Sequence, residues 1–294
     1  MLLTLGALWL AGTILPGCGK GPSPPEGAVP IPASPSQRQV KESSAASQKE
    51  VEVYVPCGVA SPFKAIKTAF EQDHPGISIR MLVEGNTDLV KRLERGERPD
   101  VFVNIGDREM DLLVHRGAMG AESQTVYAYT SLVLVTPREN PHRIRALADL
   151  AGPAVKRIAL ADPDRVSSGY HARQLLREAG LWEAVRPKLV IKPGARGPLN
   201  LVLKGQAEAA LIYSTCLYED RTQPPAGPAD ANPGLRTIPL AEQAARIPCR
   251  AALTPKGEAS EGARQFLAFL SGSQARAALQ AWQWEAPLEG SREP

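Results

Sequence analysis

The sequence predicts an α/β protein in which strands and helices alternate within one large domain or two modest ones. Two observations predict this class. Short runs rich in β-branched and apolar residues, such as 51–55 and 209–213, recur along the chain and are typical of strands. Between several of them, apolar residues recur at helical spacing up to a glycine, a natural helix end. This alternation indicates a parallel sheet covered by helices on both faces.

The composition supports a globular protein and argues against a nucleic-acid partner. Of the 294 residues, 43% are hydrophobic and 22% are charged, which is enough apolar material for a real core. The net charge is only +3, and no basic run is interleaved with aromatic residues. A nucleic-acid-binding surface is expected to show a strong positive charge and such basic runs, so we exclude that class.

The first half of the globular region is predicted to contain four strands and three long helices. The strands are expected at 51–55, 77–83, 99–103 and, as one long run, 126–135. The first helix should begin with Ser61 as its cap and Pro62 at its first position. The second should open after Asn86, and the third should be capped by Asp107.

The second half repeats the alternation. Strands are expected at 157–160, 188–192 and 209–213, with a Gly-rich turn at 193–197, a surface loop at 221–234 and a crossing strand at 251–253. Two capped helices, at 260–270 and 273–282, complete the chain.

The stretch from Arg157 to Trp182 forms the centre of the prediction. A short strand is broken by Asp162 and Pro163, and Ser167 and Ser168 then open a helix. The first amides of a helix have no internal partners and carry the positive end of its dipole, so an anion can bind there. An ordinary turn with a serine-capped helix explains the same residues, and the stretch alone does not decide between the two.

The N-terminus predicts export and attachment to a membrane. Residues 1–17 are apolar or small and lead into Cys18, which resembles a bacterial lipoprotein signal with Cys18 as the lipidated residue. Residues 19–49 are rich in Pro, Ser, Gly and Ala without apolar periodicity, as in an extended tether. We therefore expect the globular part to be held on the periplasmic or cell-surface side of a membrane.

RGERPDVFV at 95–103 and IALADP at 158–163 head a series of motifs. In order and spacing, this series resembles the periplasmic molybdate-binding proteins, the solute receptors of molybdate and tungstate ABC importers. The resemblance runs from about Val51 to Trp284. Its most specific motifs are RGERPDVFV at 95–103, DL before AG at 149–152 and IALADP at 158–163. Weaker ones lie at 181–182, 204–209, 211–213 and 266–270. Pro62-Phe63 with His74-Pro75 is closer to the branch that includes archaeal tungstate receptors.

The resemblance implies a two-lobed periplasmic-binding-protein fold of type II. Each lobe would be a mixed sheet flanked by helices, and two crossing hinge segments would join the lobes, which close on the ligand. The expected division is 50–128 and 249–294 for the first lobe and 129–248 for the second. The implied protein is a monomer without cofactor or enzymatic activity that delivers an inorganic ligand to ABC permease subunits.

The family binds its tetrahedral oxyanion through hydroxyls and backbone amides, without a charged side chain. Transferred position by position, the binding residues fall at Gly58, Asn86, Ser168, Ala195 and Tyr213, and Ser61 lies three residues after the first. Gly58 and Asn86 stand where the family has serines. The ligand is therefore left open among molybdate, tungstate, another oxyanion and a metal.

Three cysteines, Cys57, Cys216 and Cys249, map near the cleft or hinge of this architecture. One interpretation is a Cys216–Cys249 disulfide with Cys57 buried as a small apolar residue. A second is a soft-metal receptor, in which the three sulfurs hold copper or, with one more ligand, zinc. A third is a thiol enzyme or redox protein with Cys57 as the reactive group.

Overall fold

The computed structural model describes residues 49–218, 222–227, 232–240 and 246–287. All of them belong to one of two compact units of the chain, residues 46–294. The predicted lipoprotein signal, its Cys18 and the tether lie outside the described residues, except that Lys49 opens the first strand. Among the described residues, no helix is both long and apolar enough to cross a bilayer.

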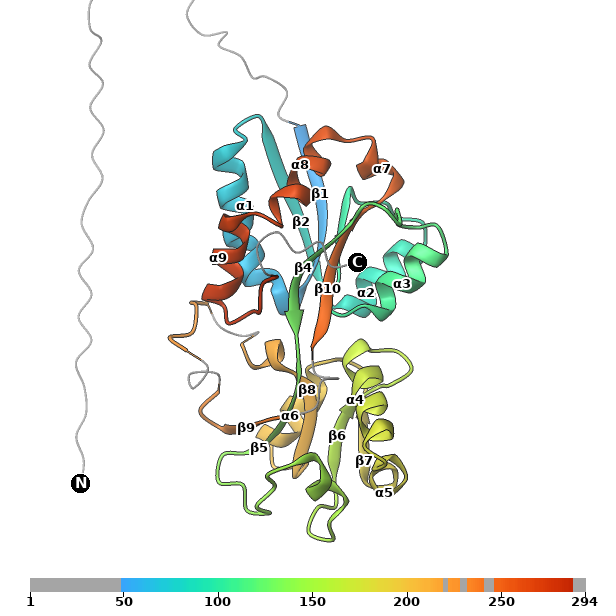
Figure 1. The fold of residues 1–294 in the computed structure, drawn as a ribbon, viewed down its shortest axis with the longest axis vertical. Helices are drawn as coiled ribbons and strands as arrows, with labels where there is room; N and C mark the ends of the chain where they lie inside the picture. Colours follow the sequence, from blue (N-terminus) through green and yellow to red (C-terminus); the bar gives the residue numbers. More distant parts are fainter. Residues whose placement is uncertain (1–48, 219–221, 228–231, 241–245, 288–294) are drawn as a thin grey trace, which may run out of the picture. The chain divides into compact units, whose positions relative to one another are not determined.

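Two five-stranded mixed sheets organise these residues, with strand orders β2-β1-β3-β10-β4 and β7-β6-β8-β5-β9. We call the part built on the first sheet lobe 1 and the part built on the second sheet lobe 2 (Figure 1). The strands are β1 Lys49–Pro56, β2 Ile77–Glu84, β3 Val101–Val103, β4 Gln124–Thr130, β5 Leu132–Pro137, β6 Ile158–Ala161, β7 Leu189–Lys192, β8 Ala209–Tyr213, β9 Leu235–Pro239 and β10 Ile247–Leu253.

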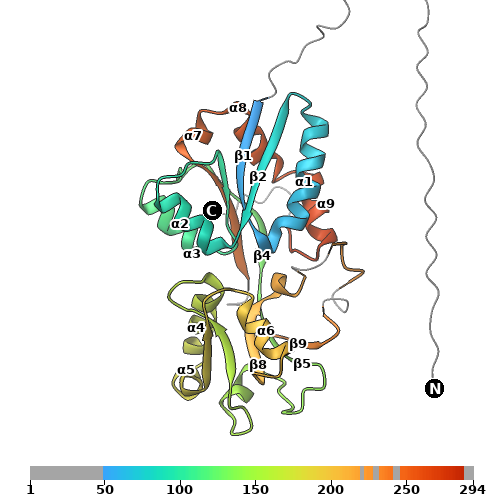
Figure 2. The ribbon, with the colours of Figure 1, turned by 180° about the vertical axis from the view of Figure 1, so that it is seen from behind.

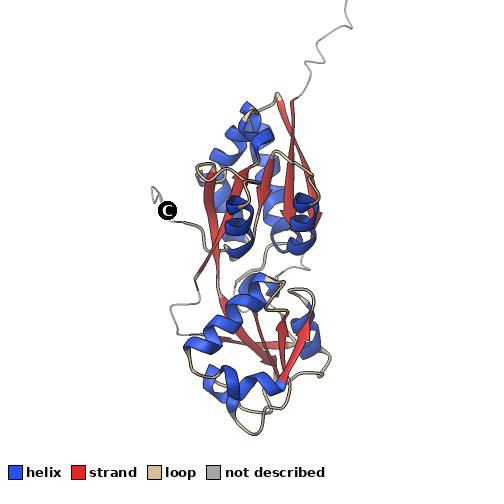
Figure 3. Ribbon diagram, turned by 90° about the vertical axis from the view of Figure 1, so that its right-hand side faces the viewer, coloured by secondary structure: helices blue, strands red, loops and turns tan. Residues whose placement is uncertain are grey.

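Helices flank both sheets, as the strands and helices of Figure 3 show. The α-helices are α1 Ala60–Asp73, α2 Asn86–Glu94, α3 Arg108–His115, α4 Ser167–Glu178, α5 Trp182–Val185, α6 Gly197–Leu203, α7 Pro255–Glu258, α8 Glu261–Phe269 and α9 Ser273–Ala281. Short 3₁₀ turns are η2 Cys57–Val59, η3 Leu147–Ala151, η4 Arg186–Lys188 and η5 Ser214–Leu217. The predicted fold class, two mixed sheets flanked by helices, is confirmed.

The two sheets share one topology. In lobe 1, β1 lies between β2 and β3 and runs parallel to both; in lobe 2, β6 lies in the same way between β7 and β8. The carboxyl ends of parallel strands meet at one edge of a sheet, and the crevice where the strand order reverses is the usual place for a ligand in such sheets.

The run predicted as a single strand over 126–135 is two strands that belong to different sheets. β4 pairs with β10 in lobe 1, whereas β5 pairs with β8 and β9 in lobe 2, and Ser131 separates them. The last four residues of β4 and the first five of β5 are buried, so hydrophobic periodicity could not reveal the break between them. β10 lies beside β4 and is longer than the predicted 251–253, with a register shift between Cys249 and Arg250 (Figure 1).

Each face of the lobe 1 sheet has its own apolar core because strand side chains alternate between faces. Tyr54 and Phe102 pack with the buried residues of α2 and α3. On the other face, Phe70 of α1 meets Phe266 and Phe269 of α8 edge-to-face, at centroid distances of 5.2 and 5.4 Å. α9 packs beside α1 on this face (Figure 2).

Several helix starts differ from the prediction. The first helix begins at Ala60, so Ser61 lies inside it and does not cap it. The cap of α4 is Val166, and the Ser167 hydroxyl makes no capping bond. Asp107 holds the cap position of α3 without a side-chain capping bond. Instead, the Ser167 hydroxyl donates to Glu109, and Asp107 accepts a hydrogen bond from His171. The prediction also missed β9, α5 and α7.

We expect Gly169→Ala to destabilise the protein by about 2 kcal/mol, because overpacking against rigid groups is costly. A Cβ at Gly169 would overlap the Ala161 carbonyl, which is backbone and cannot move aside. Urea unfolding would measure the change. The control is Gly76→Ala, where a Cβ meets no atom within 4 Å among the described residues. Equal stability of the two variants would contradict the prediction.

Candidate functional site

A cavity of about 540 Å³ is lined by residues of both lobes. Lobe 1 contributes the segments that follow β1, β2 and β3, and lobe 2 contributes those that follow β6, β7 and β8. Of the six predicted ligand-binding residues, five line this cavity: Gly58, Asn86, Ser168, Ala195 and Tyr213. Ser61 is not among the lining residues. The structure thus brings five of the six together, and their role in binding stays a prediction.

Three polar side-chain atoms at the cavity are buried and have no hydrogen-bond partner among the described residues. They are Asn86 Oδ1, Ser168 Oγ and Tyr213 Oη. Buried polar groups are nearly always paired because an unpaired one has lost its water without replacement. The oxygen and nitrogen of an Asn amide are interchangeable by a flip, so Asn86 can also present an N–H. These atoms are therefore available to a polar ligand.

Tyr213 ends β8 and is only 3% exposed. Burial raises the pKa of the Tyr213 hydroxyl well above its usual value, and the negative charge of Glu109 raises it further. The hydroxyl therefore stays protonated at physiological pH and can donate a hydrogen bond. Its neighbour, the Ser167 hydroxyl, is bound to Glu109.

Gly58 and Ala195 can offer only main-chain groups. Gly58 follows β1 in the turn η2, and a Cβ there would come within 3.0 Å of Ile105 Cδ1. Ala195 lies in the turn between β7 and α6. Both positions face the same cavity, so backbone amides on opposite lobes can approach one guest.

Sequence reasoning missed Glu109, although its carboxylate lies at the cavity. Glu109 is in the first turn of α3 and is 6% exposed. It accepts hydrogen bonds from the Ser167 amide, at 3.1 Å, and from the Ser167 hydroxyl, so it occupies the start of α4 from the opposite lobe. Acidic residues are common in first helical turns, so no sequence signal distinguished this one.

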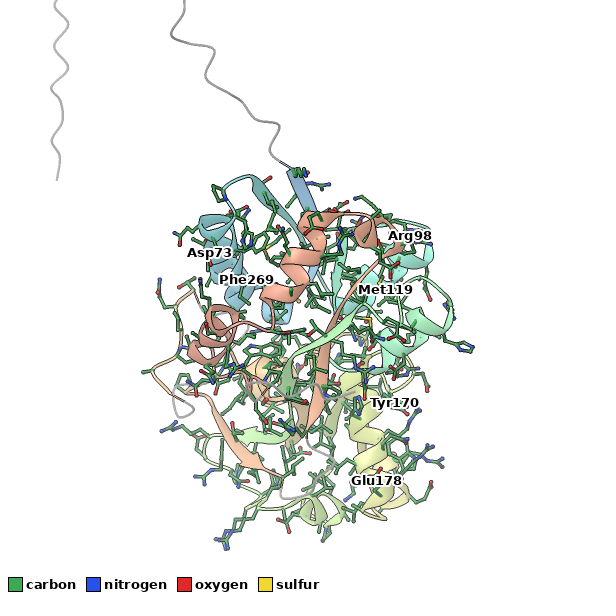
Figure 4. The ribbon with its side chains drawn as sticks, turned by 45° about the horizontal axis from the view of Figure 1, so that its top comes forward. Asp73, Arg98, Met119, Tyr170, Glu178 and Phe269 are labelled. Carbon is green, nitrogen blue, oxygen red and sulfur yellow. The ribbon has the colours of Figure 1, made fainter. Side chains whose placement is uncertain are left out.

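The two residues before Glu109 also reach lobe 2. Asp107 accepts a hydrogen bond from His171 Nε2 at 2.8 Å. Arg108 lies 5.1 Å from the ring centroid of Tyr170, which Figure 4 labels on α4, and donates to the Asp164 carbonyl. Three consecutive residues of lobe 1 therefore hold the beginning of α4.

The environment of Asp107 favours its ionised form. Burial by itself raises the pKa of this carboxyl group, but the hydrogen bond and charge of His171, together with backbone donors, hold it below its usual value of 3.8.

Two of the three arrangements considered for the cysteines, the disulfide and the three-sulfur metal site, are wrong, and the reactivity of Cys57 stays a prediction. No disulfide joins Cys57, Cys216 and Cys249. Cys57 is exposed rather than buried, and it lines the cavity with Cys216. Cys249 is fully buried in β10 outside the lining, and burial raises the pKa of its thiol to about 12. In the described part of the chain, no group of three or more His, Cys, Asp and Glu side chains could hold a metal ion.

Two lobes that line one cavity with the carboxyl ends of their parallel strands define a receptor for a small solute. Comparison with known sequences agrees. The chain belongs to the family of bacterial extracellular solute-binding proteins, whose sequence profile matches residues 51–285.

Individual relatives bind different ligands. The molybdate-binding protein ModA of Escherichia coli (strain K12) is 23% identical over 180 residues, which cover 60% of this chain and 70% of that protein. The periplasmic molybdate-binding protein of Azotobacter vinelandii has a TM-score of 0.63 at 18% identity, covering 81% of this chain and 100% of that one. A periplasmic thiamin-binding protein has a TM-score of 0.67 at 17% identity, covering 85% and 87%. The structural likeness establishes the fold and leaves the ligand undetermined.

We expect Asp107→Asn to lower the free energy of unfolding by about 1 kcal/mol at pH 7, since the hydrogen bond to His171 loses its charge. Because the folded protein holds the Asp107 pKa below 3.8, the wild-type advantage should be full above that value. It should disappear as the pH falls through the lowered pKa. Urea titrations of both proteins at pH 7, 5 and 3 would measure it, and a deficit independent of pH would contradict the prediction.

Proposed function

We propose that the protein is an extracytoplasmic solute-binding lipoprotein of an ABC importer that binds a tetrahedral oxyanion of the molybdate and tungstate type between its lobes. The observation that carries this proposal is that Asn86, Ser168 and Tyr213, three residues that line one cavity, each have a buried polar atom without a hydrogen-bond partner among the described residues. The molybdate-binding relative supports the oxyanion class. Attachment through Cys18, delivery to permease subunits, a monomeric state and the absence of catalysis belong to the same proposal.

The helix starts supply the directed donors that an oxyanion needs. α2 opens at Asn86 and α4 at Ser167, so the first turns of both helices lie at the cavity; the Ser167 amide donates to Glu109, which leaves the amide of Ser168 for an anion at α4. Lys91 and Arg196 also line the cavity and add positive charge at its edge. Discrimination among anions then depends on the size of the cavity and the direction of its donors.

The size of the cavity indicates that closure matters. Four oxygens, each with the roughly 30 Å³ share of a water molecule, occupy about 120 Å³, well below the cavity volume of about 540 Å³. A bare tetrahedral oxyanion therefore needs the lobes to approach further, or else it binds together with water. Closure around a ligand is a common motion of two-lobed receptors.

We expect Tyr213→Phe to weaken the binding of molybdate and tungstate by about 10- to 100-fold, the usual effect of losing a hydrogen bond to a charged partner. Titration calorimetry would measure the affinity. The matched control is Tyr54→Phe, which removes a hydroxyl bound to Glu97 outside the cavity lining and should leave the affinity unchanged. Equal affinities in wild type and Tyr213→Phe would reject the pocket.

Gly58→Ser should strengthen molybdate binding about tenfold, because it restores a hydroxyl at the position where the molybdate-binding family has a serine. The new Cβ meets only the end of the Ile105 side chain, which can turn away. Gly58→Ala is the control, since it adds the same Cβ without a donor. The prediction fails if the serine and alanine variants bind molybdate equally.

A further inference from the structure

Two acidic residues line the cavity, Asp88 and Glu109, and only Glu109 is hydrogen-bonded to the start of α4. Glu109 accepts hydrogen bonds from both the amide and the hydroxyl of Ser167. The next residue is Ser168, whose buried hydroxyl has no hydrogen-bond partner among the described residues. Each carboxylate oxygen has two acceptor sites, so Glu109 keeps acceptor capacity beyond these two hydrogen bonds.

Close packing places Glu109 near any ligand that Tyr213 binds. Gly106, with a φ of 98°, immediately precedes the start of α3. A Cβ there would lie 3.0 Å from Tyr213 Oη and 3.1 Å from Ser167 Oγ. The Tyr213 and Ser167 hydroxyls therefore lie on the same side of Gly106, and the Ser167 hydroxyl is the one bonded to Glu109. An anion that accepts a hydrogen bond from Tyr213 would thus lie close to the Glu109 carboxylate.

An ionised Glu109 carboxylate and an oxyanion without a proton repel each other when they lie side by side in this cavity. Both offer only acceptor oxygens, and two neighbouring negative charges repel strongly where water is excluded. One proton between them turns the repulsion into a charge-assisted hydrogen bond. Near neutral pH, phosphate and arsenate still carry a proton, whereas molybdate, tungstate and sulfate carry none.

We propose that Glu109 is a specificity-determining residue that accepts a hydrogen bond from the ligand, so that the cavity favours tetrahedral oxyanions that carry a proton. This rests on the proposed function, since it assumes a tetrahedral oxyanion in the cavity, but it moves the preferred ligand from molybdate and tungstate to phosphate and arsenate. When the anion has no proton, Glu109 takes one from water and its O–H then donates to the anion, so binding consumes one proton from solution.

The other charged and titratable groups around Glu109 do not make this distinction. The Lys91 and Arg196 cations attract every anion, and Lys91 is paired with Asp88 at 2.8 Å. Tyr213 stays protonated. Among the described residues, the neighbouring elements also carry Asp107 and Arg108 at the start of α3, His171 on α4, Cys57 in η2, Cys216 in η5 and Cys249 in β10.

The test compares wild type with Glu109→Gln by titration calorimetry, using phosphate, arsenate, molybdate and tungstate between pH 6.5 and 8.5. In wild type, the affinity for molybdate should rise by up to tenfold for each unit of falling pH. Glu109→Gln should abolish this pH dependence and lower the preference for phosphate over molybdate at least tenfold. Glu208→Gln is the matched control, because Glu208 pairs with Arg157 away from the cavity.

The outcomes separate the two proposals. If an oxyanion binds but Glu109→Gln changes neither the phosphate-to-molybdate ratio nor the pH dependence, the role of Glu109 is overturned and the proposed function stands. If no oxyanion binds to either protein at millimolar concentration, both are overturned. If Glu109→Gln does not fold, the wild type decides: a molybdate affinity that does not rise from pH 8.5 to 6.5 overturns the role of Glu109.

Discussion

Parallel strands deliver their carboxyl ends to one edge of a sheet, and in this protein both sheets direct that edge to the same cavity. Helices α2 and α4 begin there with amides that have no partner inside the helix. Because the topology supplies these donors, few positions require a particular side chain. Gly58 and Ala195 can therefore line a binding cavity with nothing but main chain to offer.

Three neighbouring side chains of lobe 1 make the contacts with the start of α4 in lobe 2. Asp107, Arg108 and Glu109 are consecutive in lobe 1, and each contacts the start of α4 or the loop before it. The same helix start that attracts an anion thus already holds an internal carboxylate. A ligand at Ser168 would lie next to Ser167, through which Glu109 of lobe 1 contacts α4 of lobe 2.

Much of this architecture could be predicted from the sequence because strand and helix periods alternate clearly. Five cavity residues were placed by a family resemblance that ties loops to strand ends. Hydrogen bonds between side chains that lie far apart in the sequence could not be predicted. Ser167 was expected to cap its own helix, but its hydroxyl donates to Glu109, which lies 58 residues earlier. Likewise, the apolar run around Ser131 conceals a change of sheet, because both strands are buried.

The register shift between Cys249 and Arg250 has a mechanical consequence. Paired strands cannot slip by one residue without turning every side chain to the opposite face, so β4 and β10 resist sliding. Where the ladder is irregular, fewer hydrogen bonds oppose bending. Because β4 continues through Ser131 into β5 of lobe 2, a bend of this strand pair would turn lobe 2 relative to the rest of lobe 1 without breaking the register of either sheet.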